Sequence, residues 1–134
     1  MIKNKLLGTV AIAAQNVRNV HWNMKNNDFY TLHKITDKVY NELNEYVDQI
    51  AEKMLMRNQN PISKYSEFID NSEIKELDAK SFTAVETVEI VVSTLNTLLD
   101  MITKSEWDAF TQPMIDEMIL FMDKMKWIFS SYKF

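Results

Sequence analysis

Two histidines, His21 and His33, are the residues of this sequence best suited to bind a transition metal. They are its only histidines, and because the chain has no cysteine, any metal must be bound through nitrogen and oxygen. We expect one helix to end near Lys25 and an antiparallel one to begin near Asp28, which places the two imidazoles at about the same level. Asp37 follows His33 by four residues and shares its helix face. Two imidazoles and a carboxylate that converge in this way suit a divalent transition metal.

A second pair of acids, Asp48 and Glu52, is also spaced four residues apart. Asp48 lies eleven residues after Asp37, close to three helical turns, so both pairs point the same way around the helix. At 1.5 Å per residue the pairs are about 16 Å apart along the axis, whereas metal–ligand bonds are only about 2 Å long. One chain therefore cannot close all of these groups around one ion.

A second copy of the chain would bring the separated groups together. If this helix packs antiparallel against its copy across a two-fold axis near Glu42–Leu43, Asp48 and Glu52 of one chain face His33 and Asp37 of the other. A contact of that kind creates two identical sites. The hypothesis requires an oligomer, because a monomeric protein could not build the site.

Each of these residues also has an ordinary explanation. Carboxylates four residues apart on a charged helix usually form a solvated face, and single histidines are often plain core or surface residues. Trp22 is most often a core or interface aromatic, and the nine methionines fit core packing better than a metal relay. The spacing alone leaves these alternatives open.

The composition favours long helices in a single domain that spans 1–134. Hydrophobic residues make up 46% of the chain, which excludes a disordered protein, and one glycine and two prolines are too few for many strands and tight turns. No apolar run approaches the roughly 20 residues of a membrane span, and the first residues lack a signal-peptide cleavage pattern. We therefore expect a cytoplasmic protein without a membrane partner. A net charge of −4 and scattered basic residues argue against nucleic acid as the main partner.

Apolar spacing predicts two helices in the first half of the chain, the second running from about Phe29 to Arg57. The turn between them, 26–28, has asparagines that tolerate the left-handed conformation and an aspartate, Asp28, that can cap the second helix. The expected core faces are Leu6, Val10, Ala13, Val17, Val20 and Met24 in the first helix, and Leu32, Ile35, Val39, Leu43, Tyr46, Ile50 and Met54 in the second.

Two more helices are predicted in the second half. One opens with a capping box from Thr83 to Glu86, and the other starts near Thr111 with Pro113 in its first turn. A long crossover between Asn58 and Phe82, with a short helix at 66–71, gives an all-α, ferritin-like four-helix bundle. The expected core faces are Val85, Val88, Val92, Leu95, Leu99 and Ile102, and then Met114, Met118, Phe121, Met125 and Ile128.

At this point the sequence resembles the Dps family of bacterial miniferritins. The segment NVRNVHWNMKNNDFYTLHKITD, 16–37, is similar to the family's first ferroxidase motif, and VDQIAEK, 47–53, resembles the second. The likeness covers most of the chain, including the crossover and Trp127 in the last helix. The family's ligands for iron fall on His21, His33, Asp37, Asp48 and Glu52.

The resemblance implies a dodecameric shell with ferroxidase sites at its two-fold interfaces. Ferrous iron would be oxidised there by hydrogen peroxide or oxygen, and ferric mineral stored inside. The family places a tryptophan where Trp22 falls. This suggests that Trp22 traps stray oxidising equivalents, with plain packing as the alternative. Acid should weaken iron loading, since protonated imidazoles cannot bind metal.

The chain departs from the family in three places. The hairpin turn has asparagines where glycine is common, and Pro113 stands where the acidic iron-entry pore often has an acid. The short termini carry only Lys3, Lys5 and Lys133, so we expect DNA binding to be weak or absent. The alternatives are a nucleoid-associated, DNA-protecting cage with little catalysis, and a plain helical bundle that serves as an interaction module.

Overall fold

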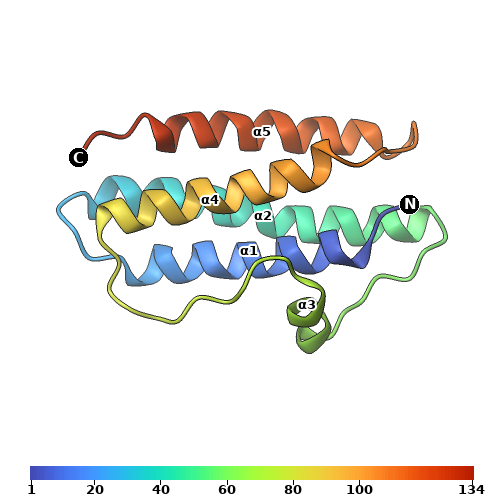
Figure 1. Ribbon diagram of the computed structural model, residues 1–134, viewed down its shortest axis with the longest axis horizontal. Coiled ribbons are helices and arrows are strands. Elements are labelled where there is room, and N and C mark those ends of the chain that lie inside the picture. Colours follow the sequence, from blue (N-terminus) through green and yellow to red (C-terminus); the bar gives the residue numbers. More distant parts are fainter.

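The structure is a computed structural model that describes all residues, 1–134, as five helices without a strand. These are α1 (Asn4–Asn23), α2 (Phe29–Met56), α3 (Tyr65–Asn71), α4 (Ala84–Thr103) and α5 (Gln112–Ser130). The four long helices lie side by side, and the short α3 stands off to one side, next to α1 (Figure 1). The predicted all-α bundle with one long crossover and a short helix is confirmed. None of the helices is long and apolar enough to span a bilayer.

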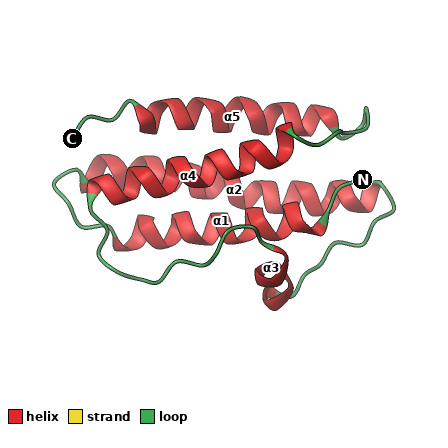
Figure 2. Cartoon of the chain, viewed as in Figure 1, coloured by secondary structure: helices red, strands yellow, loops and turns green.

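The crossover between α2 and α4 runs back along α1 (Figure 2), and amide side chains of α1 hold it there by hydrogen bonds. Asn16 donates to the carbonyl of Lys75 and accepts from the amide of Leu77, and Asn19 donates to the carbonyls of Leu77 and Asp78. Both asparagines are buried, so these bonds replace water for the backbone of an otherwise irregular segment.

The helix ends follow the sequence signals only in part. The predicted capping box is present, since the hydroxyl of Thr83 accepts from the amide of Glu86 and the Glu86 carboxylate accepts from the amide of Thr83. Asp28 occupies the N-cap of α2 but makes no side-chain cap bond, contrary to expectation. The left-handed asparagine is Asn58 (φ 60°), which ends α2, and not a residue of the 26–28 turn.

The core positions predicted for α1 are all buried, and those for α2 are buried except for Ile35, which is half-buried. In α4 and α5 the prediction is confirmed at six positions and wrong by a partial rotation at the other five. The six buried positions are Val88, Leu95, Ile102, Met114, Met118 and Met125. Val85 is 43% exposed, whereas Val91 and Leu98 are fully buried. In α5 the core takes Ile115, Met122 and Phe129, while the predicted Phe121 and Ile128 are half-buried. Both helices carry apolar residues around more than one face, so spacing alone could not fix the inward direction.

Candidate metal centre

The imidazoles of His21 in α1 and His33 in α2 meet beside the α1–α2 turn. Their rings stack with centroids 3.8 Å apart and planes inclined by 14°. Nδ1 of His21 is 2.8 Å from the carbonyl oxygen of His33, and Nδ1 of His33 is 2.8 Å from the carbonyl oxygen of His21. The expectation that the two rings lie at the same level is therefore confirmed.

These two reciprocal contacts determine which ring nitrogens are free. A carbonyl oxygen can only accept a hydrogen bond, so each Nδ1 must carry the hydrogen when the ring is neutral. The lone pair then remains on Nε2 of both rings. In metal sites, histidine ligands are commonly oriented by such a bond from the second ring nitrogen to a carbonyl or carboxylate.

Asp37 lies on the Nε2 side of His21. Its Oδ1 is 3.7 Å from Nε2 of His21, and its Oδ2 accepts a hydrogen bond from Asn41 at 3.1 Å. An open hollow of about 350 Å³ is lined by His21, His33 and Asp37 together with Tyr30 and Lys34. The hollow faces the outside of the single chain, so a partner could complete it.

The surroundings of His21 favour the neutral form of its ring. Burial lowers the pKa of His21 below its usual 6.5, and the neighbouring His33 lowers it further. The carbonyl of His33 and the carboxylate of Asp37 act in the opposite direction but do not outweigh burial. At neutral pH the Nε2 lone pair of His21 is therefore free to bind a cation.

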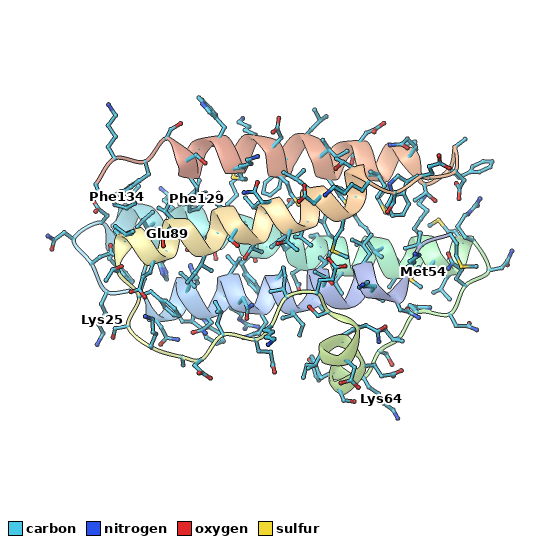
Figure 3. All side chains as sticks on the ribbon, in the orientation of Figure 1. Lys25, Met54, Lys64, Glu89, Phe129 and Phe134 are labelled. Carbon is cyan, nitrogen blue, oxygen red and sulfur yellow. The ribbon has the colours of Figure 1, made fainter.

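The other two predicted ligands, Asp48 and Glu52, lie apart from this hollow. Both are exposed on α2. Figure 3 labels Lys25, at the end of the bundle near the imidazoles, and Met54, near its opposite end. No group of three or more His, Asp or Glu side chains within one chain is arranged to hold a metal ion by itself. The fold thus gathers three of the predicted residues loosely and leaves the two acids separate.

Sequence reasoning missed several neighbours of the imidazoles. Thr36 is fully buried, and its Oγ1 is 3.1 Å from Nδ1 of His21. The available signal was a polar residue on an otherwise apolar face of α2. Trp22 is 55% exposed and is not a core residue; the Arg18 guanidinium lies 4.5 Å from its ring centroid and 5.1 Å from that of Tyr40.

Comparison with known proteins places this arrangement in a family. The model of the ferritin-like domain matches residues 4–119. The "DNA protection during starvation protein" of Listeria innocua is 29% identical over 136 residues, which cover 96% of this chain and 87% of the relative. The chain belongs to the Dps proteins of the ferritin-like family.

Solved structures of Dps proteins share the fold. A Listeria innocua Dps variant has a TM-score of 0.88 and 27% identity, with 96% of this chain and 89% of the other covered. In that variant, glycine replaces two histidines that are separated by the same 12 positions as His21 and His33. The Dps protein of Vibrio cholerae, described as one of the "ferritin-like diiron-carboxylate proteins", has a TM-score of 0.88 and 23% identity, covering 96% of this chain and 84% of the other.

Proposed function

We propose that this Dps protein binds ferrous iron between two copies of α2 and oxidises it with hydrogen peroxide or oxygen. His21, His33 and Asp37 of one copy and Asp48 and Glu52 of the other would form each site. The observation that supports this proposal best is the pair of imidazoles, each held through Nδ1, with Nε2 of His21 3.7 Å from a carboxylate oxygen of Asp37.

The exposed face of α2 supports an interface between two copies. A cavity of about 340 Å³ between α1, α2 and α3 is bordered by Tyr40 and Asn44, and a second of about 400 Å³ is bordered by Asn44 and Asp48. Tyr65 and Ile69 of α3 expose apolar surface beside the first cavity. An antiparallel copy of α2 laid along this face would cover these hollows and bring its acids to the imidazoles.

The donor set suits iron as a substrate. Neutral imidazole nitrogens bind ferrous iron well, and three carboxylates would favour the harder ferric product. In the reaction, two ferrous ions each give one electron to hydrogen peroxide. The O–O bond breaks, two protons are taken up, and two waters leave. Ferric iron would then collect inside a cage of twelve copies, with a mass near 190 kDa for 15.8 kDa subunits.

The test is anaerobic loading with ferrous iron, followed by peroxide addition, with absorbance recording the ferric product. We expect the double variant Asp48→Ala with Glu52→Ala to lose rapid oxidation while its helical content and thermal stability stay unchanged. The matched control is Glu45→Ala with Gln49→Ala, because these residues are also exposed on α2 and four positions apart. Equal oxidation rates in both double variants would contradict the assignment.

Protection of DNA is the second candidate function, favoured by the names of the relatives. Consuming ferrous iron and peroxide together would protect DNA without any contact, since these are the reactants that generate hydroxyl radicals. Direct coating is not supported by the charge, because each subunit carries −4. Backbone binding needs a surplus of basic residues that this chain lacks.

A further inference from the structure

The hydroxyl of Thr36 reaches the imidazole of His21 from inside the bundle. Its Oγ1 is 3.1 Å from Nδ1 of His21 and 2.7 Å from the carbonyl oxygen of Leu32. Thr36 is 0% exposed, so water cannot take the place of either partner. The hydroxyl is therefore placed between one group that can only accept and one ring nitrogen.

The single hydroxyl hydrogen decides the direction of the second contact. A threonine hydroxyl has one hydrogen to donate and two lone pairs that accept. The hydrogen is used for the Leu32 carbonyl, the closest acceptor, so toward His21 the oxygen can only accept. The contact is satisfied only when the hydrogen of a neutral His21 ring is on Nδ1.

The other acceptor near Nδ1 of His21 is shared. The carbonyl of His33 lies inside α2, where it is also placed to accept the amide four residues further along the helix. The Thr36 oxygen also lies 3.1 Å from this carbonyl but does not donate to it, because its one hydrogen is used for Leu32; the donors to the carbonyl are the backbone amide and Nδ1 of His21. A carbonyl with several donors is a weaker partner for each of them, which gives the Thr36 oxygen a share in holding the ring.

The same arrangement recurs elsewhere in the chain, at Thr9. The hydroxyl of Thr9 donates to the carbonyl of Lys5 at 2.6 Å and accepts the amide of Glu73 at 2.9 Å. The hydroxyl of Thr87, by contrast, donates to the carbonyl of Thr83 and accepts no hydrogen bond. A buried threonine in this protein can thus serve as an oriented acceptor, and Thr36 does so toward a ring.

We propose that Thr36 is a positioning residue, whose hydroxyl oxygen, together with the carbonyl of His33, fixes the Nδ1–H tautomer of His21 and so keeps the Nε2 lone pair directed at the metal site. Thr36 does not touch the metal in this scheme. The inference rests on the proposed function, because it assigns Nε2 of His21 to a metal. It adds that the ring is prepared by the protein before iron arrives.

The direct test uses the metal-free protein labelled with ¹⁵N in its histidine rings. With only two histidines, four ring-nitrogen signals are expected, and the spectrum is recorded at pH 8, above the ordinary histidine pKa of about 6.5. In the wild type, each ring should show widely separated signals for a protonated Nδ1 and a bare Nε2. In Thr36→Val, which keeps the shape but loses the oxygen, the two His21 signals should move toward each other.

Three controls separate positioning from packing. The signals of His33 serve as a reference in the same spectrum, since its Nδ1 bonds the carbonyl of His21 and not Thr36. Thr36→Ser should restore the wild-type separation, because it restores the oxygen without the methyl group. Thr87→Val removes an equally buried hydroxyl that bonds neither ring and should change neither pair. An unchanged His21 pair in Thr36→Val, or a failure of Thr36→Ser to restore it, would overturn the proposal.

Binding of Co²⁺ alone, followed by its visible absorption, links the tautomer to the site. We expect Thr36→Val to bind Co²⁺ about tenfold more weakly than wild type, as is typical when the group that orients a ligand is removed. Thr36→Ser and Thr87→Val should bind like wild type. Wild-type affinity in Thr36→Val would refute the role of Thr36 alone. If wild-type protein bound no Co²⁺, the proposed metal site itself would fail.

Discussion

His33 stacks against two aromatic rings, with centroids 3.8 Å from that of His21 and 4.8 Å from that of Phe29. Its Nδ1 also satisfies the carbonyl of His21 near the end of α1. The side chain therefore joins α1 to α2 in the metal-free protein, in addition to its proposed function. A residue can serve both purposes because Nδ1 and Nε2 face different partners.

We expect His33→Ala to lower the free energy of unfolding of the metal-free protein by about 1–2 kcal/mol, since it removes a hydrogen bond and the stacked ring. Urea unfolding in the presence of a chelator measures this. Lys34→Ala, an exposed neighbour in α2, should change stability by less than about 0.5 kcal/mol. Equal effects of the two substitutions would show that the imidazole pair contributes nothing to the fold.

At the scale of single residues, the sequence predicted those positions that depend only on the number of residues along a helix. The levels of His21 and His33 follow from their distances to the turn. The separation of Asp37 from Asp48 follows from their spacing of eleven positions. The contact of Thr36 could not be predicted, because its hydroxyl direction depends on how closely α1 approaches α2. The exposure of Trp22 depends in the same way on tertiary packing.

At the scale of the helices, α3 approaches α1 closely at Gly8, the only glycine of the chain. A Cβ added there would lie 2.8 Å from the carbonyl oxygen of Phe68 and 3.2 Å from Cβ of Asn71. Backbone at that distance cannot yield as the end of a flexible side chain can. Gly8 is therefore required by packing, and its φ is not left-handed.

Gly8→Ala should destabilise the protein by roughly 1–3 kcal/mol, as overpacking typically does. The sign is informative, because the same change inside a free helix stabilises it by about 1 kcal/mol. Thermal unfolding gives the sign, and faster amide exchange in 65–78 would show that α3 has moved. Gln15→Ala, exposed on the same helix, is the control. A stabilised Gly8→Ala protein would contradict the tight contact.

At this scale the number and order of helices could be predicted from the sequence, but not the rotation of α4 and α5. In α1 and α2, apolar residues that recur in steps of three and four mark the inward faces. In α4, residues such as Val91 and Val92 are both apolar, so only the neighbouring helices decide which one is buried.

For the whole molecule, the shared site predicts complementation between two inactive variants. One carries Asp48→Ala with Glu52→Ala, and the other carries His33→Ala with Asp37→Ala. In a mixed pair, one site receives every intact ligand and the other receives none of these four. Random pairing at equal amounts should therefore restore about a quarter of the wild-type oxidation rate.

The measurement is oxidation by co-expressed, co-purified variants, compared with the same two proteins mixed after separate folding and assembly. Activity close to zero in the co-expressed sample, with intact particles of wild-type mass, would exclude a site divided between copies. Helix spacing predicted that the proposed site needs a second copy of the chain, whereas the number of copies in the assembly follows only from the family resemblance.

Asp37 and Asp48 are eleven residues apart on α2, close to three whole helical turns, so the length of this segment sets the direction of one acid relative to the other. A single residue inserted after Leu43 would turn the distal acids by about 100° and displace them by only 1.5 Å. The buried side chains beyond the insertion, Tyr46, Ile50 and Met54, would turn by the same angle, so the core and the proposed divided site would lose alignment together. Selection on this segment should therefore tolerate many exchanges of side chain while rejecting almost any change in its length.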